Sequence, residues 1–236
     1  ANVSHEIRTP LTVLMGFVET LQTLPLVAQE RARYLDLMAQ QATRMHSVVQ
    51  DLLTLSRLEG SPLPGVREWH PLQTLLHSCE EEGRALSRLV TRDQARPHEW
   101  SFPASESVVG EIAGSMKELQ SALSNLISNA VRYTPAGGRI TVQWHVLADG
   151  RGVFSVRDTG PGIAPEHIPR LTERFYRIDR SRSRETGGTG LGLAIVKHVV
   201  QRHGAVLEIS SVLGQGSMFS VCFPADRLRA AHALKP

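Results

Sequence analysis

The stretch SHEIRTPLTVLMGFVETL, at residues 4–21, carries the pattern that decides the first part of the fold. Its apolar side chains recur in alternating steps of four and three, at Ile7, Leu11, Leu14, Val18 and Leu21. This heptad spacing is typical of a helix that packs in a bundle. A second apolar stripe follows the break at Leu24-Pro25-Leu26 and runs from Leu35 to Leu58. The sequence therefore predicts two long helices joined by a short turn, as an antiparallel hairpin.

A helical hairpin on its own would leave apolar surface in contact with water. Pairing with a second copy of the chain would bury that surface in a four-helix bundle, so we expect a homodimer. The alternative is that the hairpin packs only against the rest of its own chain, and the sequence leaves this open.

The segment GSPLPG, at residues 60–65, ends the second helix and is typical of a linker. We expect a hairpin domain at residues 1–60, a linker at 61–67 and a second domain at 68–236. In the second domain, periodicity predicts helices at 72–89, 119–133 and 191–203, and strands at 140–144, 153–156, 206–210 and 218–223. The prediction is an α+β sandwich, with one mixed sheet and helices on one face.

Composition narrows the class of protein. The chain has 236 residues, enough for two domains, and its 41% of hydrophobic residues can supply a core. Lys and Arg number 26 against 23 Asp and Glu, and a net charge of +3 is too mild to indicate a nucleic-acid partner. Cys79 and Cys222 have neither a metal nor a redox spacing, so we expect two reduced core cysteines.

The first cluster of residues that could carry out chemistry is SHEIRTPL, at residues 4–11. His5 precedes the apolar stripe, so we expect it to face solvent. A neutral imidazole is a good nucleophile toward phosphorus, and its reference pKa of about 6.5 keeps it mostly neutral in the cytosol. Glu6 can hold one ring nitrogen while the other attacks, and Thr9, one helical turn away, can hold a water. Pro10 should bend the helix. Taken alone, an exposed His in a helix is usually an ordinary surface residue.

The second cluster is NLISNAVRYTP, at residues 125–135. Asn125, Asn129, Arg132 and Tyr133 fall on one helical face. Amide oxygens suit Mg²⁺, and the Arg guanidinium suits phosphate oxygens. Helix caps or surface polar contacts would explain the same residues equally well.

Two glycine-rich clusters follow. In the first, Asp158 ends an apolar strand and is followed by Gly160 and Gly162, a pattern that suits recognition of a base amino group, although turns after strands often look alike. The second, GGTGLGL at residues 187–193, opens a helix whose free amides predict an anion site. It superficially matches the dinucleotide fingerprint, but no βαβ unit with an acidic residue about 20 positions later follows, which excludes that reading.

The Arg-rich segment at residues 169–184 lies between these two clusters. A basic, polar segment between two parts of a phosphate site is a plausible mobile lid. Elsewhere in the chain it would be read as an ordinary solvated loop.

Together and in this order, the clusters resemble the H, N, G1, F and G2 boxes of sensor histidine kinases. The resemblance covers nearly the whole chain, and the ordered set is far more specific than any one motif. It implies a dimerisation and histidine-phosphotransfer hairpin, followed by an ATP-binding domain of the Bergerat fold shared with gyrase, Hsp90 and MutL. Residues 1–26 and 163–198 are similar in particular to the kinases that sense phosphate limitation.

Residue by residue, the resemblance implies that His5 accepts the phosphoryl group, with Glu6 as its acid–base partner. Thr9 would position water when the enzyme acts as a phosphatase on its partner. Asn129 would bind Mg²⁺ with help from Asn125, and Arg132, where many relatives have Lys, would lie near the phosphates.

The same resemblance assigns the rest of the nucleotide site. Tyr133 would pack on the adenine, Asp158 would accept its amino group, and Gly160 and Gly162 would shape that pocket. Arg177 would reach the γ-phosphate from the lid. The phosphates would lie against Gly188, Gly190, Leu191 and Gly192.

The expected function is therefore autophosphorylation of His5 from Mg-ATP and transfer to an aspartate on the receiver domain of a response regulator. No apolar run reaches the roughly 20 residues of a membrane span. Because His5 lies unusually close to the start of the sequence, we expect the cytoplasmic part of a longer bacterial inner-membrane protein. Two rivals remain: an ATPase like Hsp90 or MutL, which would form no phosphoprotein, and a degenerate dimeric scaffold without chemistry.

Overall fold

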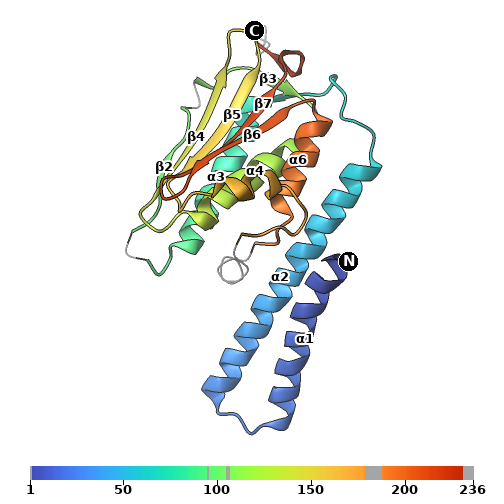
Figure 1. Ribbon diagram of the computed structural model, residues 1–236, viewed down its shortest axis with the longest axis vertical. Coiled ribbons are helices and arrows are strands. Elements are labelled where there is room, and N and C mark those ends of the chain that lie inside the picture. The colour runs from blue at the N-terminus through green and yellow to red at the C-terminus, as the bar shows by residue number, and fades with distance from the viewer. Residues whose placement is uncertain (1, 95, 105–106, 179–187, 231–236) are drawn as a thin grey trace, which may run out of the picture. The chain divides into compact units, whose positions relative to one another are not determined.

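The computed structural model describes residues 2–94, 96–104, 107–178 and 188–230, with the backbone alone for residues 2, 3 and 5. The chain divides into two compact units between Arg57 and Leu58. The first unit is the predicted hairpin, made of α1 (Asn2–Thr23) and the greater part of α2 (Ala28–Gly60) (Figure 1).

Local contacts form the turn of the hairpin. The Leu24 N–H donates to Thr20 O at 3.0 Å and ends α1. The Glu30 carboxylate accepts a 3.2 Å hydrogen bond from the Val27 N–H, which caps the start of α2. Near the turn the rings of Phe17 and Tyr34 pack with their centroids 5.6 Å apart. These contacts fix two antiparallel helices, as the heptad stripes predict.

The second unit contains a five-stranded sheet in the order β2-β4-β5-β7-β6. Its strands are β2 (Glu99–Ser101), β4 (Arg139–Val146), β5 (Gly152–Asp158), β6 (Val206–Val212) and β7 (Gly216–Phe223). β2 pairs with β4 in parallel, and all the other pairs of this sheet are antiparallel. The sheet is therefore mixed, as predicted.

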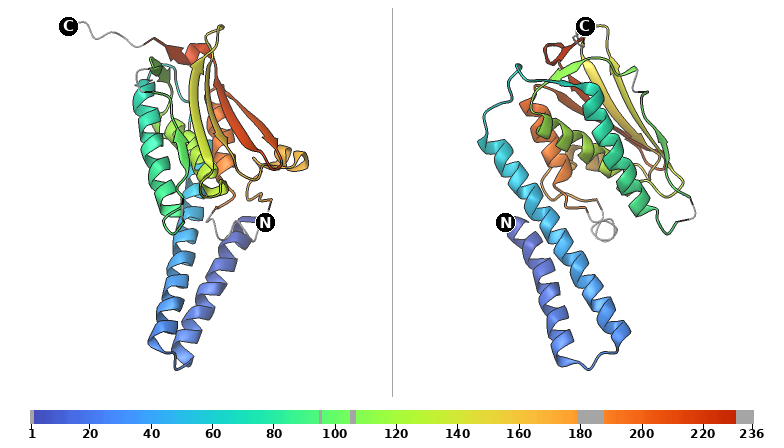
Figure 2. Two further views of the ribbon diagram at one scale, coloured as in Figure 1. Left: turned by 90° about the vertical axis from the view of Figure 1, so that its left-hand side faces the viewer. Right: turned by 180° about the vertical axis from the view of Figure 1, so that it is seen from behind.

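Three helices cover one face of this sheet (Figures 1 and 2): α3 (Leu72–Val90), α4 (Met116–Tyr133) and α6 (Gly192–Arg202). In α4 one face is fully buried, through Leu119, Leu123, Leu126, Ile127 and Val131. It packs toward strand residues such as Ile140, Phe154 and Val156, which are also buried. Each such side chain contributes about 1.5–3 kcal/mol when removed from water. The polar residues of α4 therefore lie on the helix face that does not pack against the sheet.

A second, three-stranded sheet was not expected from the sequence. β1 (Trp69–Pro71), β3 (Glu111–Ala113) and β8 (Leu228–Arg229) pair antiparallel in the order β1-β3-β8. Strands of two or three residues carry no readable alternation, and their partners lie far apart in sequence. The prediction of a single sheet was therefore incomplete. Short 3₁₀ helices lie at η2 (Pro165–Arg170) and η3 (Ala225–Arg227).

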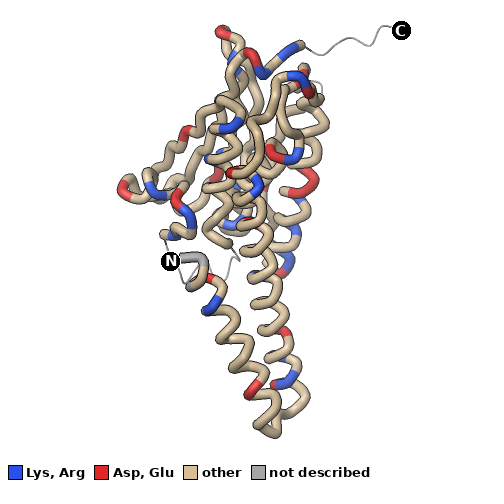
Figure 3. The backbone as a smooth tube through the Cα atoms, turned by 90° about the vertical axis from the view of Figure 1, so that its right-hand side faces the viewer, with Lys and Arg blue, Asp and Glu red and all other residues tan. Residues whose placement is uncertain are grey.

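Charged residues are interspersed over the second unit, whereas α1 has no charge between Arg8 and Glu19 (Figure 3). Among the described residues, no helix is apolar and long enough to span a membrane. Both cysteines are free, and Cys79 is buried, which raises the pKa of its thiol to about 12. A thiol of this kind stays protonated and unreactive.

Candidate functional site

The polar face of α4 presents several of the predicted site residues. Asn125, Asn129 and Arg132 are half-buried along it, and Tyr133 ends the helix with 43% of its surface exposed. The Asn125 Nδ2 group donates to Ser121 O at 2.8 Å, which orients its side-chain oxygen away from its own helix. That oxygen would lie 2.5 Å from a Cβ placed on Gly192, so Asn125 adjoins the first turn of α6.

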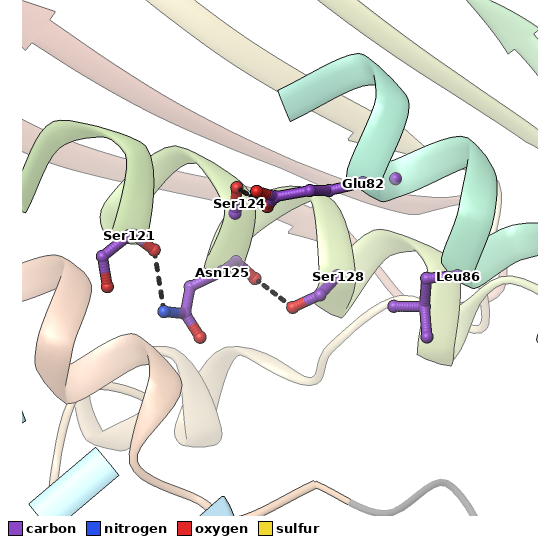
Figure 4. A pocket seen from close by; sticks show the side chains of 7 residues that line it. Glu82, Leu86, Ser121, Ser124, Asn125 and Ser128 are labelled. Carbon is purple, nitrogen blue, oxygen red and sulfur yellow. Dashed lines mark hydrogen bonds between the residues drawn. The ribbon is translucent and has the colours of Figure 1, made fainter. Parts of the chain in front are cut away.

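A separate pocket of about 280 Å³ lies between α3 and α4 (Figure 4). Its polar lining includes the Glu82 carboxylate, which accepts hydrogen bonds from Ser124 Oγ at 2.5 Å and Gln120 Nε2 at 2.7 Å. Figure 4 shows the Asn125 side chain directed away from Glu82. Asn125 is the one predicted site residue in the lining, so this pocket is not where the described site residues gather.

Asp158 lies at the end of β5, the middle strand of the sheet, and is only 5% exposed. One carboxylate oxygen accepts the Gly160 N–H at 2.8 Å. Burial raises the pKa of Asp158, and hydrogen bonds from the backbone of Gly160 and Ser217 only partly oppose this. A Cβ on Gly160 would lie 2.7 Å from Tyr133 O, so Asp158, Gly160 and Tyr133 adjoin one another.

Gly162 has a positive φ of +69°, and a Cβ there would collide with the backbone of Val212. Only glycine fits this position, because both the conformation and the space exclude a side chain. Gly162 therefore lets the loop after β5 pass directly over the edge strand β6.

The loop before α6 brings a cation to the same region. Phe175 has a left-handed backbone, with φ of +63°, and its N–H donates to Gly190 O at 2.8 Å. A Cβ on Gly190 would lie 3.3 Å from the Cγ of Arg177. A Cβ on Gly188 would lie 3.9 Å from both Arg177 Nη2 and Tyr133 Oη. Arg177, Tyr133 and Gly188 thus converge on one place.

Helix α6 begins at this point. The Leu191 side chain is fully buried, and its N–H donates to Thr189 Oγ1 at 3.2 Å. Leu191 therefore anchors the loop, and only its backbone is available to a ligand. The first amides of α6 have no partner within the helix, which makes this N-terminus suited to phosphate.

The remaining predicted residues lie in the hairpin unit. His5, Glu6 and Thr9 belong to the first turns of α1, where Glu6 is half-buried and Thr9 exposed. The side chain of His5, and with it the expectation that it faces solvent, lies outside the described residues. The same holds for Gly187 and for residues 179–184 of the expected lid.

Sequence reasoning missed some features of this region. Thr134 is 4% exposed, and its hydroxyl finds no hydrogen-bond partner among the described residues. Ser217 supports Asp158 from β7. Neither the buried hydroxyl nor the left-handed Phe175 has a signature in sequence, since both depend on contacts with distant segments.

Comparisons with known proteins decide the family. Residues 1–61 match the His Kinase A (phospho-acceptor) domain, and residues 114–227 match the family described as histidine kinase-, DNA gyrase B- and HSP90-like ATPase. The chain is 48% identical to the phosphate regulon sensor protein PhoR of Pseudomonas aeruginosa, and the match covers all of this chain and 52% of the length of that protein. The chain belongs to the histidine kinases. It spans about half the length of the curated relatives it matches.

Solved histidine kinases share the fold. Full-length ShkA in complex with AMPPNP is 29% identical, with a TM-score of 0.66 over 99% of this chain and 46% of that one. Histidine kinase ThkA in complex with the response regulator protein TrrA has a TM-score of 0.69 over 95% of this chain and 60% of that one. At 19% identity, the second likeness concerns the fold alone. The predicted helical hairpin and α/β sandwich are thereby confirmed, and the roles of single residues stay predictions.

Proposed function

We propose that this histidine kinase chain binds Mg-ATP in its second unit and transfers the γ-phosphoryl group to His5. The observation that carries the proposal is the convergence of Tyr133, Arg177 and Gly188 beside the buried Asp158. An aromatic ring, a cation and free amides with one buried acceptor form a combination suited to a nucleotide.

The base would be held at the end of β5. The Asp158 carboxyl oxygen accepts an N–H donor and would also receive the amino group of adenine, and the exposed ring of Tyr133 would pack on the base. Gly160 and Gly162 keep side chains out of this place.

The phosphates would lie at the start of α6. They would lie against the backbone of Gly188, Gly190, Leu191 and Gly192, and Arg132 and Arg177 would provide positive charge. Arg177 would neutralise the charge that develops on the transferred group.

The residues present also fit Mg²⁺. The described residues contain no group of three or more His, Cys, Asp or Glu that could hold a metal, so a divalent cation would need oxygen ligands from the nucleotide. Asn129, with Asn125 beside it, offers the hard amide oxygens that Mg²⁺ accepts together with phosphates and water. The ion would supply charge neutralisation on the phosphates.

The chemical step would be carried by the hairpin. His5 Nε2 would form a bond to the γ-phosphorus while the bridging P–O bond breaks, and ADP would leave with the electron pair. Glu6 would hold the Nδ1 proton and accept it as the ring becomes phosphorylated. The phosphoryl group would then pass to an aspartate of a response regulator. In a separate phosphatase activity, Thr9 would hold the water that hydrolyses that aspartyl phosphate to aspartate and inorganic phosphate.

Further parts of the proposal rest on the relatives. A homodimer would bury the apolar face of the hairpin. The likeness to the Pseudomonas phosphate regulon sensor supports a role in phosphate-starvation signalling. We also propose that the chain works in the cytoplasm, as the catalytic part of a longer membrane sensor.

The test is incubation of the chain with Mg²⁺ and γ-labelled ATP. We expect an acid-labile, alkali-stable label that disappears in His5→Gln and persists in His46→Gln, a change of another histidine in the hairpin. A label of normal intensity in His5→Gln would refute the assignment of the phosphoacceptor.

A second pair of variants tests the metal assignment. Asn129→Ala should lose most Mg-ATP affinity, whereas Gln120→Ala, on the same helix but bonded to Glu82, should keep it. ATP hydrolysis without any phosphoprotein would instead favour the ATPase alternative, and nucleotide binding without either reaction would favour a scaffold.

A further inference from the structure

Residues Leu58–Gly65, here called the strap, are held by side chains of the second unit although their sequence is typical of a loose linker. Arg202 Nη1 donates to Leu58 O at 2.7 Å and to Ser61 O at 3.0 Å, and its Nη2 donates to Pro62 O at 2.7 Å. Arg227 donates to Pro64 O and Gly65 O, each at 3.0 Å. Backbone carbonyls all along the strap therefore have fixed partners.

Arg202 is itself fixed by an acidic side chain of α4. Its Nε donates to Glu118 Oε2 at 2.9 Å and its Nη2 to Glu118 Oε1 at 3.0 Å, with the side chains 9% and 17% exposed. With the bonds to the strap, the guanidinium makes as many hydrogen bonds as it has N–H groups. Lysine could not reproduce this set, because an ammonium has three donors on one atom.

The first turn of the strap also contacts the loop that carries Arg177. The Glu59 carboxylate pairs with Arg174 and lies 3.7 Å from His198 Nε2 of α6. Arg174 precedes Arg177 by three residues. The strap is therefore connected to α4, to α6 and to the loop before α6 at once.

We infer that Arg202 is a positioning residue of the kinase, which makes the strap a rigid arm of the nucleotide-binding unit. The division of the chain between Arg57 and Leu58 agrees with this, because it lies inside α2 and before the Gly- and Pro-containing segment. Because the strap is rigid, it restricts the positions that bound ATP can take relative to the hairpin. This restriction raises the effective concentration of the bound ATP at the hairpin. This consequence for the reaction rests on the proposed function.

The strap itself can be tested without any reaction. A nitroxide is attached at Leu63→Cys, whose native side chain is 73% exposed, in a Cys222→Ser background, while the buried Cys79 stays unreactive. We expect an electron paramagnetic resonance spectrum of restricted motion, which becomes clearly more mobile in Arg202→Met and in Arg202→Lys. Arg229→Met is the matched control, because Arg229 pairs with Glu111 at 2.6 Å and, among the described residues, donates no hydrogen bond to the strap. It should leave the spectrum unchanged.

The reaction gives the second readout. Arg202→Met should lower the rate of autophosphorylation by about threefold or more, with the ADP dissociation constant unchanged within about twofold. If Arg202→Met does not fold, Arg227→Met takes its place, because it removes only part of the hydrogen bonds that hold the strap. A strap as immobile in the variant as in the parent would overturn the inference. An absence of label in the parent chain would instead count against the proposed function, and the resonance spectra would still decide the strap.

Discussion

Asp158 places an ionisable carboxyl at the end of a central strand, where only 5% of its surface reaches solvent. Burial raises the pKa of this group, which means that the folded chain holds its charged form at a cost in stability. Two backbone N–H donors offset part of that cost. A buried carboxyl whose pKa is shifted in this way is typical of a site that binds a ligand.

The first prediction concerns this carboxyl. Asp158→Asn should weaken ADP binding by about tenfold or more, since one acceptor is replaced by a donor. The unfolding temperature at neutral pH should not fall, because the variant no longer buries a charge. Isothermal titration and thermal unfolding check the two parts. A variant that binds ADP normally would remove Asp158 from the nucleotide site.

Gly192 gives a second test at the scale of one atom. A Cβ there would lie 2.5 Å from Asn125 Oδ1, and Asn125 is held in place by its bond to Ser121 O. Gly192→Ala should therefore displace the Asn125 amide and lower Mg-nucleotide affinity several-fold, while the helix loses none of its stability, since Ala is the better helix former. The control is Gly16→Ala, where nothing lies within 4 Å of the new Cβ. Equal Mg-ATP affinity in the two variants would contradict the prediction.

At the scale of elements, a buried histidine joins α6 to the start of α4. His203 is fully buried, its Nδ1–H donates to Val199 O at 2.8 Å, and its Nε2 accepts the Ser115 N–H at 3.2 Å. Both ring nitrogens are therefore used in the neutral form. Burial lowers the pKa of His203, and Arg227 and Arg202 act in the same direction, while the Val199 carbonyl and Glu118 oppose it.

The pH dependence of stability follows from this direction. Below the ordinary pKa of 6.5 the unfolded chain binds a proton at this position, and the folded chain does not. The contribution of His203 to the free energy of unfolding therefore has its full value above pH 6.5. It is lost progressively as the pH falls toward the lower pKa that His203 has in the folded chain. Urea unfolding at neutral and mildly acidic pH should show this loss, and it should shrink in His203→Gln. His145→Gln, on an exposed part of β4, should keep the full dependence. A parent-like slope in His203→Gln would contradict the assignment.

Elements with strong periodicity were predictable, and short ones were not. The helices and strands read at 72–89, 119–133, 140–144, 153–156, 191–203, 206–210 and 218–223 are all confirmed, most of them a few residues longer. β1, β2, β3 and β8 escaped prediction because each has at most three residues. Their pairing is decided by the segments around them.

At the scale of the molecule, the hairpin leaves apolar side chains exposed. Met15 is 65% exposed, Leu11 45% and Val18 39%, and all three lie on the uncharged stretch of α1. Apolar surface gathered in one stripe favours association with a second copy.

The fourth prediction tests that association. Met15→Asp combined with Val18→Asp should shift the chain from dimer to monomer in analytical ultracentrifugation, because charges would have to be buried between copies. Leu89→Asp, at an equally exposed site on α3, should leave the dimer intact. A parent chain that is monomeric at micromolar concentration would refute the proposed dimer.

The sequence by itself determined the two-part architecture, the helical hairpin and the positions of the candidate residues along the chain. Those depend on local periodicity and on motif order, which any unfolded chain already contains. The tertiary structure decided what those residues adjoin: Asn125 meets Gly192, Tyr133 meets Gly188 and Arg177, and Asp158 becomes buried. It also converted an apparent linker into a strap held by Arg202. Contacts between segments far apart in the sequence form only when the core brings them together, so no local pattern could have shown them.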